Sequence, residues 1–415
     1  MPGRVDENVK RLIIAGLAVG ISWGLAWSIL APYLRGLGYT GKEYGLVGST
    51  AVFSGALFTL LGGTLSDRYG SRPILVVGLV SESLSLVLVS MGDPLLVATG
   101  FFLYGASNGL SMVAQQALLS RTGRDEEMHY TFSYVSAAST LGGGVGSLLG
   151  WLPVLANRHL GVPLLRAYQV SLAGSGLVPL LAVPAVWGVR ERLASTSKRQ
   201  SLTSAIGRLG RVFYALLAVD AIIGFGAALS IHNIDYYFTA KYHVTSAGLG
   251  TVFGVQQLVM AGLMTLMPSL ADRAGGTLRV YLAVTGSSIP LLVAMTLVDN
   301  YPVAATLYLA RSILMNVANP LYNAFIMRLV PVELRGRASA LLSLSWTIPA
   351  GIGRAVGGLL LDIDLELPLR LTALLYTIAL AILALLFHNH TKGRPVTPTS
   401  ESVGGPSARV YFNDS

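Results

Sequence analysis

The chain has 415 residues, of which 53% are hydrophobic and 12% are charged, and its formal net charge is +9. Together with a mean hydropathy of +0.62, this composition excludes a soluble protein and indicates a membrane protein. The sequence contains no cysteine, so disulfides and thiolate metal sites are excluded.

Apolar segments long enough to cross a bilayer recur along the whole chain. About 20 apolar residues in a helix span the hydrocarbon core, and these runs are continuously apolar and contain Gly and Pro, which favours helices over a β-barrel. We therefore expect an all-α membrane protein with 12 transmembrane helices, the first of which lacks a signal-peptide cleavage site and is retained. The expected spans are residues 12–34, 43–65, 73–91, 95–119, 131–155, 165–189, 210–238, 246–270, 278–298, 302–328, 337–361 and 368–388.

The basic residues are unevenly distributed between the loops on the two sides of these spans. If the N-terminus is cytoplasmic, most of the 29 Lys and Arg residues fall in cytoplasmic segments, as the positive-inside rule requires. We therefore expect both termini to face the cytoplasm. The positive net charge then reflects membrane topology and does not indicate a nucleic-acid partner.

A short motif repeats in the two halves of the chain. The sequence LSDRYG at residues 65–70 recurs as LADRAG at residues 270–275, each time in the loop after the second of six spans. Such repeats are typical of transporters built from two related bundles. We expect a six-helix bundle at 1–189, a cytoplasmic linker at 190–210, a second six-helix bundle at 211–390 and a disordered cytoplasmic tail at 391–415.

The first copy of the motif lies in GGTLSDRYGSRP, from Gly62 to Pro73, and fits the pattern G-x-x-x-D-R-x-G-x-R. With two six-helix halves, this pattern resembles the major facilitator superfamily over about residues 11–390, although Ser71 stands where the family usually has Arg or Lys. The resemblance implies that the loop latches the cytoplasmic ends of the bundles when the cavity opens outward. The alternative is that its charges only anchor a turn. The expected latch residues are Gly63, Asp67, Arg68, Gly70, Arg72, Asp272 and Arg273.

Glycines recur every fourth residue in the first, fifth and eleventh expected spans. Such stripes let helix backbones approach closely, either as static packing or as surfaces along which helices slide. The run in the fifth span resembles the glycine-rich motif of the family's drug–proton antiporters. The glycines are Gly16, Gly20, Gly24, Gly142, Gly146, Gly150, Gly353 and Gly357.

The resemblance also implies a solute cavity lined by the first, fourth, seventh and tenth helices near the bilayer midplane. Polar side chains at this depth are costly unless they are used, so aromatic and amide residues there are candidates for the cavity wall. Alternatively, the tryptophans pack against the fifth helix and the amides hydrogen-bond between helices. The candidates are Trp23, Trp27, Asn108, Gln256, Gln257, Asn316, Asn319 and Trp346.

Charged residues inside the spans are candidates for coupling transport to ion movement. Asp220 and Arg311 fall at similar estimated depth in the seventh and tenth spans, so we expect them to pair, directly or through water, either in a contact that breaks during the cycle or as a static strut. Glu82 in the third span is a second candidate proton site or a structural partner. His232 and Asp235, three residues apart, can meet and relay protons, unless they form a solvated helix end.

No phosphate-binding loop, hydrolase elbow, zinc motif or redox signature occurs in the sequence, so we expect neither an enzyme nor a cofactor or metal. The expected function is secondary active transport of a small solute by alternating access across the cytoplasmic membrane, by a monomer and with protons as the coupling ion.

Export of a drug or metabolite is the first choice among the possible transport functions. However, the first helix lacks an acid, and Phe101 stands in the fourth helix where the family's drug exporters often carry an arginine, so their usual proton relay is not reproduced. Arg311, Arg354 and the amides leave uptake of an organic anion or sugar by symport open. A sensor that binds without transport is a remote third possibility.

Overall fold

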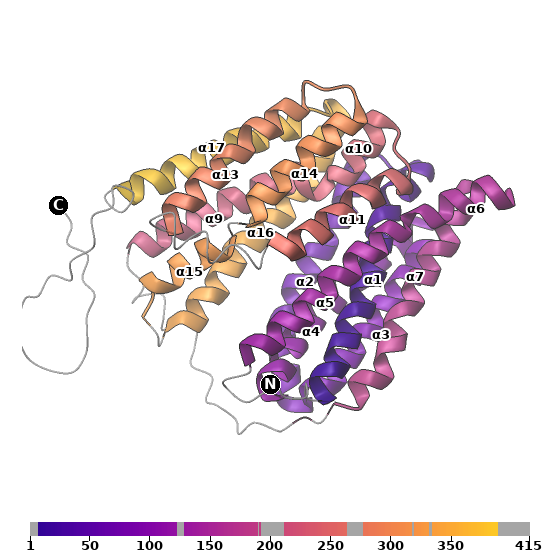
Figure 1. Cartoon of the computed structure of the whole chain (residues 1–415), viewed down its shortest axis with the longest axis horizontal. Helices are drawn as coiled ribbons and strands as arrows, with labels where there is room; N and C mark the ends of the chain where they lie inside the picture. Colours follow the sequence, from indigo (N-terminus) through magenta and orange to yellow (C-terminus); the bar gives the residue numbers. More distant parts are fainter. Residues whose placement is uncertain are drawn as a thin grey trace, which may run out of the picture.

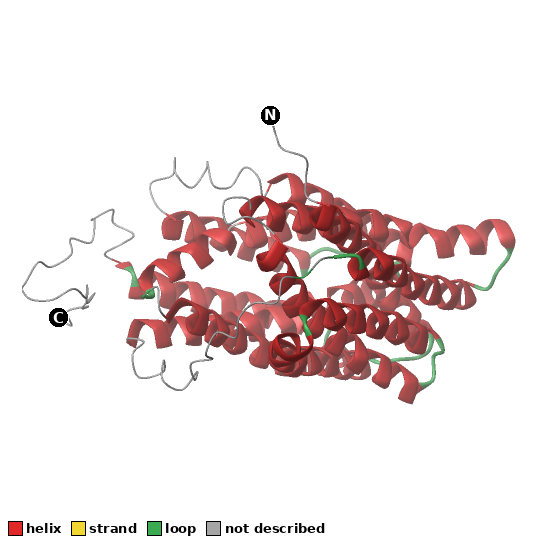
Figure 2. Ribbon diagram, turned by 90° about the horizontal axis from the view of Figure 1, so that it is seen from below, coloured by secondary structure: helices red, strands yellow, loops and turns green. Residues whose placement is uncertain are grey.

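The computed structural model describes residues 7–122, 128–189, 191, 211–263, 277–317, 319–331 and 334–388. Within these ranges all regular secondary structure is helical (Figure 2). The expected tail, most of the expected linker and the second copy of the loop motif, with Asp272 and Arg273, lie outside the described residues.

The helices follow the expected spans closely. Those of the first half are α1 (Glu7–Gly36), α2 (Gly41–Tyr69), α3 (Ser71–Ser90), α4 (Pro94–Thr122), α5 (Met128–Leu148), the short turn η1 (Leu149–Trp151), α6 (Leu152–Leu160) and α7 (Leu164–Trp187). Those of the second half are α9 (Arg211–Ser230), the turn η2 (Ile231–Asn233), α10 (Ile234–Tyr242), α11 (Ser246–Leu263), α13 (Thr277–Met295), α14 (Tyr301–Val317), α15 (Asn319–Leu329), α16 (Arg335–Ile363) and α17 (Leu367–Leu386). In the part of the chain that the structure describes, 11 helical spans are long and apolar enough to cross a membrane.

The remaining expected span, residues 302–328, is covered by α14, which ends at Val317, and α15, which begins at Asn319; residue 318 lies outside the described residues.

The two halves repeat the same packing scheme. In the first half, α1 packs against α5 and α7, and α3 packs against α4. At the corresponding positions of the second half, α9 packs against α16 and α17, and α13 packs against α14. The predicted fold of two pseudo-symmetric helical bundles is confirmed.

The glycine stripes lie mainly inside the halves, where helix backbones touch. A Cβ atom added at Gly146 of α5 would lie 2.8 Å from the carbonyl carbon of Ile21 in α1, and one added at Gly357 of α16 would lie 2.7 Å from that of Leu229 in α9. Such contacts leave no room for a side chain. These stripes therefore serve tight packing within each bundle, in agreement with the static interpretation.

The two halves contact each other at one end of the helices, which the predicted topology makes the outer end. There α2 packs against α16, and α5 packs against α11. Asp362 accepts hydrogen bonds from the backbone N–H groups of Gly41, at 2.7 Å, and Lys42, at 2.8 Å, and the Ser49 hydroxyl donates to the carbonyl of Gly351 at 2.7 Å. Figure 1 shows the halves spreading apart toward the opposite end, where α1 begins and α17 ends. The molecule is thus closed at its outer end.

Candidate functional site

A cavity of about 290 Å³ lies between the helices of the first half and borders the second half. Trp23 of α1, Glu82 of α3, Asn108 of α4 and Gln257 of α11 meet in its wall. The structure therefore brings together four residues that the sequence places in four separate spans. The full lining is Val19, Gly20, Trp23, Glu82, Tyr104, Ser107, Asn108, Ser111, Met112, Gln115, Ser139, Thr140 and Gln257.

Helix α4 contributes the largest part of this wall, including polar residues that sequence reasoning missed. Tyr104, Ser107, Ser111 and Gln115 line the cavity together with Asn108. They follow one another at spacings of three and four residues, which places them on one face of a helix. That spacing is a signal that could have identified them, because a helix face that meets lipid is apolar.

Glu82 provides the one carboxyl group among the lining residues, and its exposed fraction is 5%. It reaches the cavity from α3, although the resemblance to the family places the third helix at the periphery. The ion pairs of the described residues do not include Glu82. The Ser22 hydroxyl lies beside it and donates to the Ser175 carbonyl at 2.8 Å. An acid buried in a membrane protein is a candidate for binding a proton or a cation.

Trp23 and Trp27 form a continuous aromatic surface along α1. Their ring centroids lie 5.4 Å apart with an interplanar angle of 18°. Trp23 lines the cavity, and Trp27, one turn closer to the outer end, faces the guanidinium group of Arg354 at 5.7 Å. The shared face that the four-residue spacing predicts therefore leads from the cavity to the contact between the halves.

Four residues at this contact, Trp27, Tyr44, Asp235 and Arg354, form what we call the outer cluster. The Arg354 guanidinium group lies 5.7 Å from the Trp27 ring and 5.9 Å from the Tyr44 ring. The Tyr44 hydroxyl donates to Oδ2 of Asp235, and both residues are fully buried. The cluster joins α1 and α2 of the first half to α10 and α16 of the second. Sequence reasoning missed Tyr44, since it is uncharged and lies near the start of its helix.

His232 and Asp235 do not contact each other in the way that their spacing predicts. The His232 ring lies 5.5 Å from the ring of Trp346 on α16, whereas Asp235 faces Tyr44. Between them, Asn233 has φ −119° and ψ 17°, so the helix is interrupted and the regular relation between residues three apart is lost. The alternative of a solvated helix end is wrong, because Asp235 is 0% exposed.

Asp220 and Arg311 are both buried, but each bonds to a tyrosine. The Tyr322 hydroxyl donates to Oδ1 of Asp220 at 2.9 Å. Arg311 donates from Nη2 to the Tyr376 hydroxyl at 3.2 Å and lies over the Tyr376 ring at 5.5 Å. The ion pairs found among the described residues do not include one between Asp220 and Arg311. The direct form of the expected pair is therefore absent among the described residues, and each charge contacts a tyrosine, from α15 or from α17.

The remaining amide candidates form hydrogen bonds within the second half. Gln256 Nε2 donates to the Ser312 hydroxyl at 2.6 Å, and Asn316 Nδ2 donates to the Ser312 carbonyl at 2.8 Å. Asn319 Nδ2 lies 3.4 Å from Oδ1 of Asn316. The interhelical alternative describes the contact between Gln256 of α11 and Ser312 of α14, whereas Asn316 and Ser312 belong to the same helix. The wall of the cavity of about 290 Å³ does not include Gln256, Asn316 or Asn319.

The loop motif contacts the end of α7 in its own half. Gly70 has φ 89°, a backbone conformation that favours glycine, and the chain then enters α3. Glu191 caps this helix by accepting hydrogen bonds from the N–H groups of Ser71, at 2.8 Å, and Arg72, at 3.1 Å. The Arg72 guanidinium group donates to the carbonyl of Trp187 at 3.2 Å. Sequence reasoning missed Glu191, which follows the last helix of the first half.

The other latch candidates of the first copy lie at the end of α2. Gly63, Asp67 and Arg68 belong to its last turns, and Asp67 and Arg68 are exposed. A latch that forms when the cavity opens outward is not expected to join the halves in a molecule closed at its outer end. The latch therefore stays a prediction.

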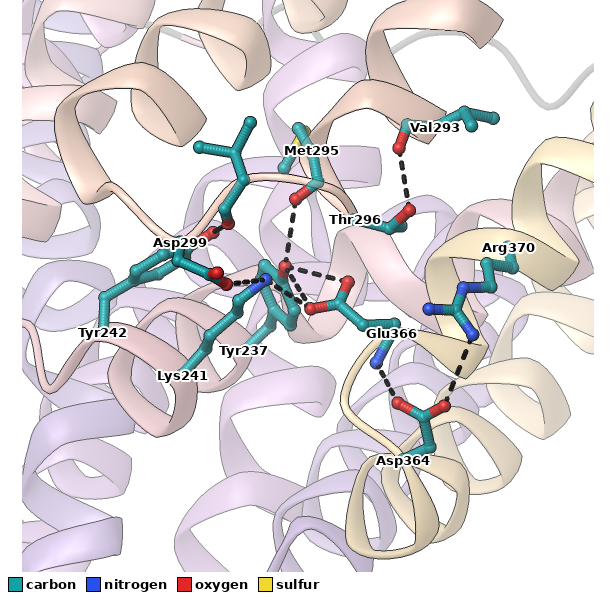
Figure 3. A network of polar contacts seen from close by, with 11 residues as sticks. Tyr237, Lys241, Tyr242, Val293, Met295, Thr296, Asp299, Asp364, Glu366 and Arg370 are labelled. Carbon is teal, nitrogen blue, oxygen red and sulfur yellow. Dashed lines mark hydrogen bonds and ion pairs between the residues drawn. The ribbon is translucent and has the colours of Figure 1, made fainter.

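A polar network ties together the outer ends of the second half (Figure 3). Lys241 of α10 lies 2.5 Å from Oε1 of Glu366 and 3.6 Å from Oδ1 of Asp299, and the Tyr237 hydroxyl donates to Glu366 at 3.1 Å. These contacts connect α10 with the loop before α14 and with the start of α17. They fix α10, which carries Asp235 of the outer cluster, to its own half.

The fold is that of solved transporter structures. A bacterial homologue of the human lysosomal transporter Spinster, in an inward-facing and unoccupied conformation, superposes with a TM-score of 0.74 over 94% of this chain and 99% of its own, at 13% sequence identity. A mutant of the nucleoside transporter NupG gives a TM-score of 0.73 over 92% of this chain and 100% of its own, also at 13% identity. At these identities the likeness shows the fold.

Sequence comparison gives the family. The chain is 22% identical to the quinolone resistance protein NorA of Staphylococcus aureus (strain MRSA252) over 380 residues, which cover 88% of this chain and 93% of NorA. The family model of the Major Facilitator Superfamily matches residues 12–353 and, in a second match, residues 216–412. The chain therefore belongs to the Major Facilitator Superfamily, and it is a multi-pass secondary transporter of a small solute, not an enzyme.

Proposed function

We propose that this transporter exports cationic or uncharged amphipathic molecules across the cytoplasmic membrane in exchange for protons, with Glu82 as the coupling acid. The observation that carries the proposal is the position of Glu82, 5% exposed in the wall of the cavity and without a basic partner among the described ion pairs. A carboxyl group that faces a solute cavity can hold either a proton or a cationic solute. Competition between the two would couple their movements.

The rest of the cavity wall supports an amphipathic solute. Trp23 and Tyr104 offer aromatic surfaces, and Asn108, Gln115 and Gln257 offer amide groups. Aromatic faces attract organic cations as well as apolar rings. A flat molecule that carries a positive charge would satisfy the aromatic surfaces and the acid at the same time.

The similarity to NorA supports export as the direction of transport. That relative is named as a quinolone resistance protein, and a transporter that protects a cell from a drug has to lower the drug concentration inside it. The glycine-rich fifth helix, which resembles that of the family's drug–proton antiporters, supports the same direction. Exchange for protons would supply the energy.

Uptake of an organic anion is the rival function, and it would need a basic group at the solute. Neither Arg311 nor Arg354 belongs to the residues that line the cavity, and the lining residues include no Lys, Arg or His. Arg311 lies against Tyr376, and Arg354 lies in the outer cluster. The charge of the cavity thus favours a cation over an anion.

The test is transport of the fluorescent cation ethidium in proteoliposomes under an imposed pH gradient. We expect Glu82→Gln to abolish the gradient-driven component while the protein still inserts and still binds ethidium, more weakly, through the aromatic wall of the cavity. The matched control is Glu43→Gln, because Glu43 is an exposed residue of a capping box at the start of α2, and glutamine preserves that box. Gradient-driven transport by Glu82→Gln at the wild-type rate would exclude Glu82 as the coupling acid.

A further inference from the structure

Arg354 is a buried cation of the second half that aromatic rings of the first half surround. Its exposed fraction is 6%, and its guanidinium group lies 5.7 Å from the Trp27 ring and 5.9 Å from the Tyr44 ring. Its Nε atom is buried without a hydrogen-bond partner. Two aromatic rings therefore contribute to holding this charge, together with the Tyr44 hydroxyl and the Asp235 carboxylate, which also interact with it.

The backbone of α2 leaves room for the cation. Gly48 lies one turn after Tyr44, and a Cβ atom added there would overlap the guanidinium group of Arg354. Asp235 lies beside Tyr44, accepts the hydrogen bond of its hydroxyl and interacts electrostatically with Arg354. Two aromatic rings, the space beside Gly48 and a nearby acid make a site suited to a flat cation.

The parts of this site belong to different halves of the molecule. Trp27, Tyr44 and Gly48 lie on α1 and α2, whereas Arg354 lies on α16. In a transporter that works by alternating access, the halves separate at the outer end when the cavity opens outward. The two rings then lose Arg354, and they face the solute pathway.

We propose that Trp27 and Tyr44 form a cation-binding site that Arg354 and a cationic group of the solute occupy in turn. Trp27 stacks on Trp23 at 5.4 Å, and Trp23 lines the cavity, so an aromatic surface leads the solute from one site to the other. When the outer ends close again, the guanidinium group returns to the rings and displaces the solute to the outside. This inference rests on the proposed function in that the solute is a cation.

The experiment measures ethidium binding to the purified full-length chain in lipid nanodiscs, without any gradient. Arg354→Ala removes the internal occupant and is expected to tighten binding by about tenfold or more. Arg354→Gln, which keeps a polar side chain without the charge, is expected to act in the same direction. Adding Trp27→Leu to either variant is expected to cancel the gain. The matched control is Arg370→Ala, which removes an exposed arginine close to the outer end.

Unchanged ethidium affinity in both Arg354 variants would overturn the proposal, and so would a gain that survives Trp27→Leu. A gain of the same size in Arg370→Ala would also overturn it, since the effect would then be one of overall charge. Adding Arg354→Ala to Glu82→Gln is expected to raise ethidium affinity by the same factor relative to Glu82→Gln alone. Failure of the proposed function appears instead as gradient-driven transport by Glu82→Gln, so the two failures are distinguishable.

Discussion

Replacing Tyr44 with phenylalanine removes one hydroxyl group from the contact between the halves and keeps the aromatic ring beside Arg354. The hydroxyl donates to Asp235, which is 0% exposed. After the substitution, Asp235 still accepts a hydrogen bond from the backbone N–H of Tyr236, at 2.8 Å. Leaving a buried acceptor without its partner costs about 1–3 kcal/mol. Because this bond joins α2 to α10, the cost falls on the form that is closed at its outer end. The equilibrium is therefore expected to shift toward the form that is open outward by about 5- to 150-fold.

A single reporter cysteine measures this shift, since the chain contains no cysteine. Ser49 of α2 is 6% exposed and faces α16, so Ser49→Cys is expected to react with a membrane-impermeant maleimide only when the outer ends part. We expect Tyr44→Phe to raise the labelling rate from the outside. Tyr242→Phe is the control, because its hydroxyl donates to Val298 at 2.6 Å within the second half. A labelling rate in Tyr44→Phe no higher than in the control would refute this account of the outer cluster.

Three further substitutions test other parts of the structure. Gly146→Leu would push a side chain into the backbone of α1 and is expected to lower the free energy of unfolding by about 1–3 kcal/mol, measured as a lower thermal midpoint. The control Gly174→Leu, at a glycine whose added Cβ would have nothing within 4 Å, should leave the midpoint unchanged. Equal midpoints in the two variants would contradict the packing role. Asp220→Asn keeps an acceptor for its tyrosine partner and is expected to retain pH-driven transport; loss of that transport in a stable protein would move the coupling role to Asp220. Asp67→Ala is expected to impair transport but not membrane insertion, and wild-type rates in vesicles at matched protein levels would exclude the latch.

The fold could be predicted from the sequence because it depends on signals that lie along the chain. The length of the apolar runs fixes the spans, and the loop motif that includes Asp67 marks the repeat. These features need no knowledge of which way each helix is turned.

The site was less predictable because it depends on helix rotation. The rise per residue gives the depth of Asp220 and Arg311, but it does not say which neighbour each side chain faces. Packing turned them toward Tyr322 and Tyr376, and tyrosines in an apolar helix give little signal of such a role. Trp23 could be placed more easily, because the four-residue spacing to Trp27 defines a common face.

Asp362 caps α2 from the other half of the molecule, so these two hydrogen bonds have to break each time the outer end opens. Helix caps contribute about 0.5–2 kcal/mol to stability, so thermal motion breaks such a contact readily. The helix also has a cap of its own: the Thr40 hydroxyl accepts from the N–H of Glu43 at 3.3 Å, and the Glu43 carboxylate accepts from the N–H of Thr40 at 2.9 Å. When Asp362 departs, the first turn of α2 therefore stays intact instead of fraying, and it is ready to be recaptured. The outer closure can be made and broken many times without melting the helix on which it is built.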